Sequence, residues 1–374
     1  MQLSGADIIV RTLIEQGCET VFGYPGGQVI NIYDSIFKYQ DEIHHVLTAH
    51  EQGASHAADG YARATGKVGV VIATSGPGAT NLVTGIATAY LDSTPLVAIT
   101  GNVSNALIGT DSFQEIDITG ITLPITKHNY FVKTVEELAD TIREAFRIAK
   151  SDRPGPVLVD VPKDVQAALT EYVAAPVVPA DPMHAAKQVR IEEAAEIINA
   201  SERPFIYFGG GLIASAASDE LLALADKIDA PVGCSMMGIS GVPTDYPRFL
   251  GMEGMHGHYA CSVGMNEADC IIACGARFND RSTGKVSAFA PHAKIVHIDV
   301  DGAELCKTVH AAVALRGDLK LTLEELLNQV ERRERPAWQE KIAELRAFED
   351  EQATDKREGM TPRNAILELN TLLT

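Results

Sequence analysis

Short apolar runs alternate with segments of helical periodicity through the first half of the chain. The runs are rich in β-branched residues, and several end in Gly or Ser–Gly. They occupy residues 20–23, 44–49, 68–74, 95–101 and 155–161. Strands that alternate with helices in this way form a parallel sheet with helices on both faces. The pattern therefore predicts a doubly wound α/β domain.

A second series of the same kind follows. Its strand-like runs are residues 204–211, 231–236, 269–278 and 294–301. Between the two series the sequence "AAPVVPADP" is rich in proline and has little periodicity, which is typical of an interdomain linker. The predicted organisation is an N-terminal domain (1–170), a linker (171–189), a central domain (190–330) and a helical connector (331–374).

The stretch "VLTAHEQGASHAADGYARATG", residues 46–66, predicts a strand that runs into a helix beginning near Glu51. Small residues three or four apart share one face of that helix. They are Ala49, Gly53, Ala57, Gly60 and Ala64. We expect this face to let another backbone approach closely.

Two shorter segments predict capped helices. The first, within residues 1–17, is a helix that Ser4 caps and Gly17 ends. Its apolar residues are spaced helically and interrupted by Arg11 and Glu15, so the segment is not a signal peptide. The last residues form an amphipathic helix that begins after Thr361.

Charge and composition narrow the class of protein. The formal net charge of -19 argues against nucleic acid or an anionic membrane as partner, and no apolar run is long enough to span a membrane. The six cysteines include no CxxC pair. Cys270 and Cys274 lie in a strand-like run, which favours buried reduced thiols over a zinc site. We therefore expect a cytoplasmic α/β protein with no metal site of its own.

Glycine-rich turns follow several of the predicted strands. Those in 22–29 and 73–81 open helices, where free N–H groups favour anions, although ordinary turn chemistry is the better explanation of such a motif taken alone. The turn in 207–213 lacks the full dinucleotide fingerprint, so a nicotinamide site has weak support. The segments "CGARFNDR" and "HIDVDG" each place polar residues just past the carboxyl end of a strand, which adds two more strand ends. Three such ends in one domain predict a nucleotide-like ligand there.

Single polar residues remain ambiguous from spacing alone. Glu51 fits a carboxylate favoured by the helix dipole as well as it fits a catalytic group. On spacing alone, the better interpretation of Lys127 is an ordinary solvated lysine. Gln114 lies in a loop, where binding residues concentrate but where polar residues are also common. The residues alone predict a ligand-binding α/β enzyme.

Nine short sequence segments, in fixed order along the chain, resemble those of a known enzyme family. They are "VFGYPGG", "HEQGASHAADGYARATGKVGV", "TSGPGATNLVTGIATAYLDSTPLVAITG", "FQEIDITGIT", "PITKHN", "RPGPVLVDVPKDV", "GMHG", "GARFNDR" and "HIDVD". Together they cover essentially the whole chain, which closely resembles the large catalytic subunits of the acetohydroxyacid (acetolactate) synthases. These are thiamine-diphosphate (ThDP) enzymes of branched-chain amino-acid biosynthesis.

The resemblance implies a chemistry. It makes Glu51 the carboxylate that hydrogen-bonds the cofactor's pyrimidine and promotes loss of the thiazolium proton. Pyruvate is then decarboxylated, and the two-carbon unit passes to a second pyruvate or to 2-ketobutyrate. Gln114 and Lys127 are the implied further catalytic residues. Phe113 and Arg277 are implied to contact substrate.

The resemblance also implies an FAD site, mostly in the central domain. The implied FAD residues are Arg153, Gly209, Gly210, Gly211, Ser235, Met236, Gly254, Met255, His256, Gly275, Ala276, Arg277, Phe278, Asn279, Asp299, Val300 and Asp318. Three positions depart from the family. Asn279 stands where Asp is usual, Gly302 where Pro is common, and Glu253 where an apolar residue is usual.

The family binds the diphosphate through Mg²⁺ on a third domain that carries a Gly-Asp-Gly motif. No such motif occurs in these residues. We therefore expect two doubly wound domains, for pyrimidine and FAD, with the third absent and Mg²⁺ bound only through it. The resemblance implies a homodimer or higher oligomer and a possible small regulatory subunit. Alternatives are half of a split enzyme, a non-catalytic FAD-binding or interaction protein, or another ThDP enzyme such as pyruvate oxidase.

Overall fold

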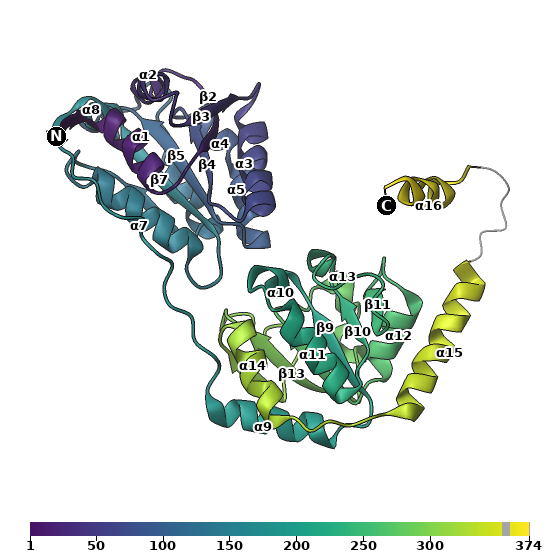
Figure 1. Cartoon of the computed structure of the whole chain (residues 1–374). Coiled ribbons are helices and arrows are strands. Elements are labelled where there is room, and N and C mark those ends of the chain that lie inside the picture. The colour runs from purple at the N-terminus through teal and green to yellow at the C-terminus, as the bar shows by residue number, and fades with distance from the viewer. Residues whose placement is uncertain (354–359, 374) are drawn as a thin grey trace. The chain divides into compact units, whose positions relative to one another are not determined.

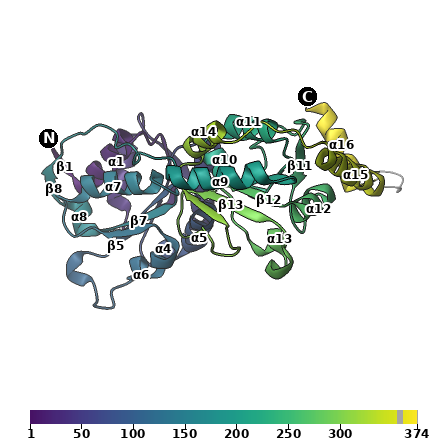
Figure 2. The ribbon, with the colours of Figure 1, turned by 90° about the horizontal axis from the view of Figure 1, so that it is seen from below.

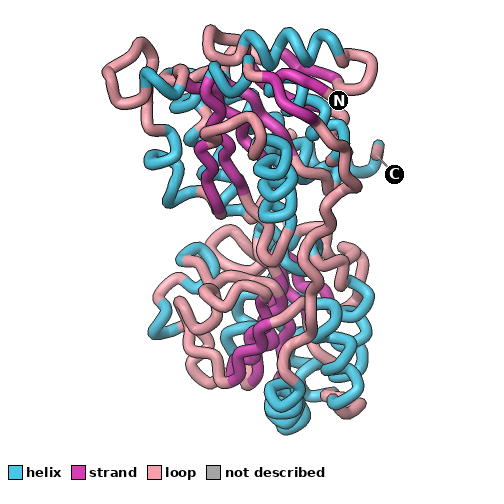
Figure 3. The backbone as a smooth tube through the Cα atoms, turned by 90° about the vertical axis from the view of Figure 1, so that its left-hand side faces the viewer, coloured by secondary structure: helices cyan, strands magenta, loops and turns pink. Residues whose placement is uncertain are grey.

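The computed structural model describes residues 1–353 and 360–373. The chain divides into two compact units, Met1–Pro182 and Met183–Thr374 (Figure 1). In each unit the strands lie among helices, as the tube in Figure 3 shows.

Unit 1, Met1–Pro182, is built on a parallel sheet of six strands in the order β3-β2-β4-β5-β7-β6. Its strands are β2 (Thr20–Tyr24), β3 (His44–Leu47), β4 (Gly69–Ala73), β5 (Leu96–Asn102), β6 (His128–Phe131) and β7 (Pro156–Pro162). Its α-helices are α1 (Gly5–Glu15), α2 (Ile30–Lys38), α3 (Glu51–Thr65), α4 (Pro77–Asn81), α5 (Val83–Asp92), α6 (Ile118–Thr122), α7 (Leu138–Lys150) and α8 (Lys163–Ala167). Strands β1 (Gln2–Ser4) and β8 (Leu169–Glu171) form a separate antiparallel pair.

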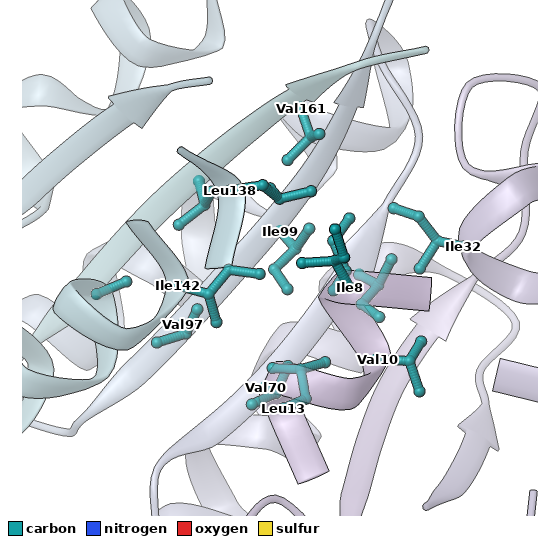
Figure 4. Packing of buried hydrophobic residues seen from close by; sticks show 14 of the residues in the cluster. Ile8, Val10, Leu13, Ile32, Val70, Val97, Ile99, Leu138, Ile142 and Val161 are labelled. Atoms are coloured by element: carbon teal, nitrogen blue, oxygen red, sulfur yellow. The ribbon is translucent and has the colours of Figure 1, made fainter. Parts of the chain in front are cut away.

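Helices cover both faces of this sheet. On one face α1, α2 and α7 bury aliphatic side chains against the alternate residues of the central strands (Figure 4). This cluster includes Ile8, Leu13, Ile32, Val70, Val97, Ile99, Leu138, Ile142 and Val161. On the other face α3 and α5 pack Ala54, Ala58 and Ile86 against the strands. Burial on both faces explains why these strands are continuous apolar runs.

Unit 2, Met183–Thr374, has a second parallel sheet, in the order β11-β10-β9-β12-β13-β14. Its strands are β9 (Pro204–Phe208), β10 (Val232–Cys234), β11 (Phe249–Met252), β12 (Cys270–Cys274), β13 (Lys294–Asp299) and β14 (Val313–Arg316). Its α-helices are α9 (Gln188–Ala200), α10 (Gly210–Ala214), α11 (Ser218–Ile228), α12 (Tyr259–Glu267), α13 (Asp280–Thr283), α14 (Leu319–Gln329), α15 (Pro336–Ala353) and α16 (Pro362–Leu372). Apolar clusters lie on both faces of this sheet too. The two sheets confirm the predicted doubly wound α/β class.

The pattern of apolar runs missed β6, β11 and β14. Each of these strands lies at an edge of its sheet. An edge strand has a neighbour on one side only, and β6 and β11 are only partly buried, so neither shows the continuous apolar run of a central strand. Several expected strands also end early, and two of them differ most. Residues 204–211 leave the strand at Phe208, and residues 269–278 leave it at Cys274, where Gly275 turns the chain with φ +55°.

The predicted helix caps are confirmed. Helix α1 begins after Ser4, whose hydroxyl accepts a hydrogen bond from the Asp7 N–H, and α16 begins after Thr361, which caps the Asn364 N–H in the same way. Helix α3 begins at Glu51 and ends at Gly66, which adopts a left-handed conformation with φ +70°. Local sequence therefore sets where these helices begin and end.

Within unit 1 the predicted close-packing face of α3 is not the face that packs. Gly53 and Gly60 have open space where a Cβ would lie. The helix instead buries Glu51, Ala54, Ser55, Ala58, Asp59 and Ala62. The glycines that permit close approach are on its neighbours: a Cβ at Gly69 would lie 2.2 Å from the Ala58 carbonyl oxygen, and one at Gly85 would lie 2.0 Å from the Ser55 hydroxyl. The sheet and α5 decide which face of α3 is buried.

No helix in residues 1–353 and 360–373 is both long and apolar enough to cross a membrane. Across the same residues, no three His, Cys, Asp or Glu side chains gather as a metal site would require.

Candidate functional site

The sheet of unit 1 has a topological switch point between β2 and β4. From β2 the chain continues through α2 to β3 on one side, whereas from β4 it continues to β5 on the other. In open α/β sheets, ligands bind at the carboxyl ends of the two strands beside such a point. Helix α3 packs across both strands, and its first residue, Glu51, lies at this edge of the sheet.

The loops that follow β2 and β4 are locked together at this edge. The Gln28 N–H donates to the Thr74 hydroxyl at 3.1 Å. A Cβ at Gly26 would lie 2.4 Å from the Thr74 methyl carbon, so only glycine fits there. Gly26, the first glycine of "YPGG", therefore allows the close contact between the two loops.

The Glu51 carboxylate is buried and held on one side. The residue is 9% exposed, and its Oε2 accepts a hydrogen bond of 2.9 Å from the Asn81 side-chain amide. Its Oε1 lies toward Gly78, where an added Cβ would come within 3.2 Å. His50, the residue before the helix, accepts the Gln52 N–H on its Nδ1 and caps α3. One carboxylate oxygen is thus fixed by Asn81, and the other faces a glycine turn.

Several buried polar atoms of unit 1 have no hydrogen-bond partner among the described residues. They include the Tyr33 hydroxyl, the Ser75 hydroxyl and the Gln28 side-chain carbonyl. Burial, and then the charge of Glu51, raise the pKa of Tyr33, so this phenol lies within electrostatic reach of the carboxylate. Buried polar groups normally find partners in the protein or in a ligand. These atoms fit a polar ligand at the switch point.

Gln114 comes from a distant segment to the same turn. It has a left-handed backbone, φ +59°, and a Cβ at Gly76 would lie 2.7 Å from its carbonyl oxygen. Gly76 immediately precedes α4, which carries Gly78 and Asn81. Phe113, by contrast, is 84% exposed. The segment between β5 and α6 that carries both residues loops away from the sheet (Figure 2).

Lys127 lies elsewhere in unit 1. Its amino group donates to the carbonyls of Ile148 and Ser151, at the end of α7. Its backbone N–H donates to Pro156, the first residue of β7. Lys127 therefore precedes β6 at the amino edge of the sheet, whereas Glu51 lies at the carboxyl edge. The structure does not bring these two residues together within the unit, and the catalytic role of Lys127 stays a prediction.

Unit 2 has its own switch point, between β9 and β12. The Gly209 N–H donates to the Cys274 carbonyl and the Gly211 N–H to the Gly275 carbonyl, both at 3.1 Å. A Cβ at Gly209 would lie 2.5 Å from the Gly275 carbonyl oxygen, and a Cβ at Gly211 would lie 2.7 Å from the Gly275 Cα. The two turns are in backbone contact, which only glycine allows.

The other predicted FAD residues of unit 2 also follow strands. Strand β10 is followed by Ser235 and Met236, and β11 by Gly254, Met255 and His256. Strand β12 is followed by Ala276, Arg277, Phe278 and Asn279. Asp299 ends β13 and precedes Val300, and Asp318 follows β14. Because all six strands are parallel, these segments share the carboxyl edge. Arg153 belongs to unit 1, where its Nε donates to the Ser93 hydroxyl at 2.7 Å.

Some of these residues already have structural roles. Phe278 is buried in ring contacts with Tyr207 and His297. Asn279 accepts the Arg281 and Ser282 N–H groups at 3.0 Å and caps α13. Asp318 caps α14 by accepting the Leu321 N–H at 2.9 Å. The side chains of Met236 and Met255, in contrast, are exposed. The edge combines tight turns with exposed apolar side chains, which fits a flat, partly apolar ligand.

Sequence reasoning missed Asn81, Tyr33 and Ser75. Asn81 and Ser75 both stand in the word "TSGPGATN", where glycine spacing attracted attention and the polar positions did not. An amide at the end of a one-turn helix that follows a glycine turn is the signal that could have found Asn81. Tyr33 lies in α2 within an ordinary amphipathic pattern and gives no such signal.

Two domain families match the chain. Residues 3–121 match the thiamine pyrophosphate enzyme N-terminal TPP binding domain, and residues 191–326 match the thiamine pyrophosphate enzyme central domain. The first match contains the switch point of unit 1, and the second contains that of unit 2.

Whole-chain relatives agree with these matches. The chain is 48% identical over 354 residues to the probable acetolactate synthase large subunit of Methanocaldococcus jannaschii, covering 92% of this chain and 59% of that protein. It is 47% identical to the isozyme 2 large subunit of Escherichia coli, covering 92% and 62%, and 41% identical to the large subunit of Buchnera aphidicola subsp. Schizaphis graminum, covering 97% and 65%. The chain thus spans about three fifths of the length of these relatives.

Proposed function

The chain belongs to the thiamine pyrophosphate enzymes, and we propose that it supplies the pyrimidine-binding and central domains of an acetolactate synthase catalytic subunit. The proposed reaction decarboxylates pyruvate and transfers the two-carbon unit to a second 2-keto acid, pyruvate or 2-ketobutyrate. The relatives are named as large subunits of acetolactate synthases.

The observation that carries the proposal is the buried Glu51 carboxylate with one oxygen held by Asn81. When bound, ThDP supplies a carbon acid and an electron sink. Asn81 orients the carboxylate, so that Oε1 can accept or hold a proton at the ring nitrogen of a pyrimidine. The unpartnered hydroxyls of Tyr33 and Ser75 can satisfy further polar atoms of such a ring. Burial excludes water that would otherwise compete for these bonds.

We propose Gln114 as a residue that contacts cofactor or substrate, because its backbone lies against Gly76 beside this turn. Exposed Phe113 is proposed to contact substrate or to line its approach. Arg277, which follows β12, is proposed to contact both FAD and the keto acid.

FAD is proposed for the carboxyl edge of the central unit, where the turns after β9 and β12 meet. Support comes from the backbone contact between Gly209, Gly211 and Gly275 and from the exposed methionines of the neighbouring turns. Mg²⁺ and the ThDP diphosphate are assigned to a polypeptide outside these 374 residues. A homodimer or higher oligomer and a small regulatory subunit are the proposed partners.

The test adds, as a separate polypeptide, the part of a relative that this chain does not span. The purified chain is incubated with pyruvate, ThDP, Mg²⁺ and FAD, with and without the C-terminal two fifths of the Methanocaldococcus jannaschii relative as a separate polypeptide. Acetolactate is expected only when both are present. Clear turnover by the chain alone contradicts the assignment of Mg²⁺ to another polypeptide.

Glu51→Gln is the decisive variant in that mixture. Removing a group that moves a proton at the reacting cofactor costs on the order of a hundredfold or more in rate. Glu136→Gln, at an exposed position of the same unit, is the matched control. Equal rates for Glu51→Gln and the control exclude Glu51 from the mechanism.

A further inference from the structure

Glu253 is a buried carboxyl at the edge where the FAD turns lie. It follows β11 directly and is 6% exposed. Its backbone N–H donates to the Cys234 carbonyl at 2.8 Å, which ties it to the end of β10. Among the described residues its Oε2 has no hydrogen-bond partner. A buried carboxyl with an unsatisfied oxygen is costly, so its protonation state matters.

Neutral groups surround this carboxyl. The Ser282 hydroxyl of α13 lies near it and by itself lowers its pKa, and the same hydroxyl lies 3.0 Å from the Tyr207 hydroxyl of β9. Burial raises the pKa of Tyr207, raises that of Cys234 to about 11 and raises that of Cys261 well above its usual range. These three groups therefore stay uncharged near neutral pH.

The charged groups nearby make contacts of their own. Arg281 of α13 is exposed and reaches the Met255 sulfur at 3.9 Å. His258 lies against Gly251 of β11 and pairs with Glu349 of α15 at 2.8 Å. Burial raises the pKa of Glu253 to about 7, although the nearby Ser282 hydroxyl lowers it.

Glu253 also lies where two of the proposed FAD segments meet. The Met255 N–H donates to the Arg281 carbonyl at 2.9 Å. Gly254 has φ +104°, and a Cβ there would lie 2.5 Å from the same carbonyl oxygen and 3.1 Å from the Ser282 Cα. The turn after β11 and the helix α13 are therefore in direct backbone contact, and the Glu253 side chain reaches the same helix through Ser282.

We propose that Glu253 is a positioning residue whose protonated form holds segments 253–257 and 279–283 together, so that FAD binding weakens when Glu253 ionises. The proposal rests on the FAD site of the proposed function. The ionised carboxylate has one hydroxyl donor and no cation bonded to it, so the contact opens to hydrate the charge. Flavin binding favours the closed contact, and by linkage it favours the protonated carboxyl.

The first test measures the FAD dissociation constant by flavin fluorescence at pH values from about 6 to about 8, on either side of the pKa. Affinity for the unaltered chain should fall by about tenfold over this range, since a one-unit change in pKa on binding is a tenfold change in affinity. Glu253→Gln keeps the size and stays uncharged, so its affinity should be nearly constant. Glu267→Gln, at an exposed position, should keep the pH dependence.

A slope that survives in Glu253→Gln overturns the proposal. His258→Gln separates the other nearby titratable side chain: loss of the slope in that variant, with the slope intact in Glu253→Gln, assigns the effect to His258 and also overturns it.

The second test needs no flavin. Amide hydrogen exchange at Met255, corrected for the intrinsic rate, should quicken from about pH 6 to about pH 8 in the unaltered chain and not in Glu253→Gln. Equal behaviour of the two overturns the positioning role even if FAD binds. Absence of FAD binding at every pH overturns the flavin site and this proposal together, and the exchange result tells that outcome from a failure of the contact alone.

Discussion

The Asn81 side-chain amide donates a 2.9 Å hydrogen bond to the Glu51 carboxylate across thirty residues of sequence. Asn81 ends α4, a helix of five residues that begins directly after the Gly76 turn, and Glu51 begins α3. The glycine turn therefore brings a donor to one oxygen of a buried carboxylate whose other oxygen faces Gly78. The same contact determines which carboxylate oxygen stays free.

Asn81→Ala tests this orientation. Losing a hydrogen bond to a charged group costs about 1.5–3 kcal/mol, so acetolactate formation in the reconstituted mixture should fall by about tenfold to a hundredfold. Asn328→Ala, at an exposed position of α14, is the control and should leave the rate unchanged. A rate within about twofold of the control shows that Asn81 does not orient Glu51 in the reaction.

Glu15 links α1 to α7 and to the segment after β8. Burial by itself raises the pKa of Glu15, but hydrogen bonds from Arg143, Ala175 and Tyr172 outweigh it and lower the pKa from 4.5 to about 2. The folded state therefore prefers the ionised form. Its stabilisation, about 3 kcal/mol, is present above pH 4.5 and is lost as pH falls toward 2.

Glu15→Gln should lower the free energy of unfolding at neutral pH by about that amount, and the difference from the unaltered chain should shrink in acid. Urea unfolding at several pH values measures it. Glu171→Gln, at an exposed position, should show neither effect. A constant difference across the pH range would refute the linkage.

The pKa of Asp160 is shifted in the opposite direction to that of Glu15. Burial raises its pKa from 3.8 to about 6, although Thr100 and Asn102 each donate a 2.6 Å hydrogen bond to it. The folded state therefore prefers the protonated form. Its stabilising contribution is full below pH 3.8 and is lost as pH rises through about 6, a change of about 3 kcal/mol.

Asp160→Asn removes this titration. The unfolding free energy of the unaltered chain minus that of the variant should fall by about 3 kcal/mol between roughly pH 4 and pH 7. Asp41→Asn, at an exposed position, supplies the control. If the difference does not change with pH, Asp160 does not titrate in this range.

Arg335 directly precedes α15 and is 4% exposed. Its guanidinium donates to the carbonyls of Ile198 and Ser201 at the end of α9 and of Ile228 at the end of α11. A cation at two helix C-termini is favoured by both dipoles. Arg335→Met leaves these carbonyls unpaired and should destabilise unit 2 by about 3 kcal/mol or more.

Thermal or urea unfolding measures the effect, with Arg332→Met, at an exposed position, as control. Comparable stability of the two variants would show that water replaces the guanidinium at both helix ends.

The order of strands and helices was predictable from sequence because it depends on local pattern. Central strands such as β4 and β12 are apolar throughout, since both faces of the sheet are covered. Helix ends were also predictable, because Ser4 and Thr361 act on N–H groups three residues away. Edge strands β6, β11 and β14 were missed because one-sided pairing places weaker demands on composition.

Local sequence is enough to place a carboxylate at the first residue of a helix after a strand, and glycine turns after other strands. Which of these features meet depends on the tertiary packing. It placed Asn81 on Glu51 and Gln114 beside Gly76, left Lys127 at the opposite edge, and buried a different face of α3 from the one its glycines indicated. The physical reason is that such contacts depend on strand order and on the packing of neighbouring elements, which residues nearby in sequence do not encode.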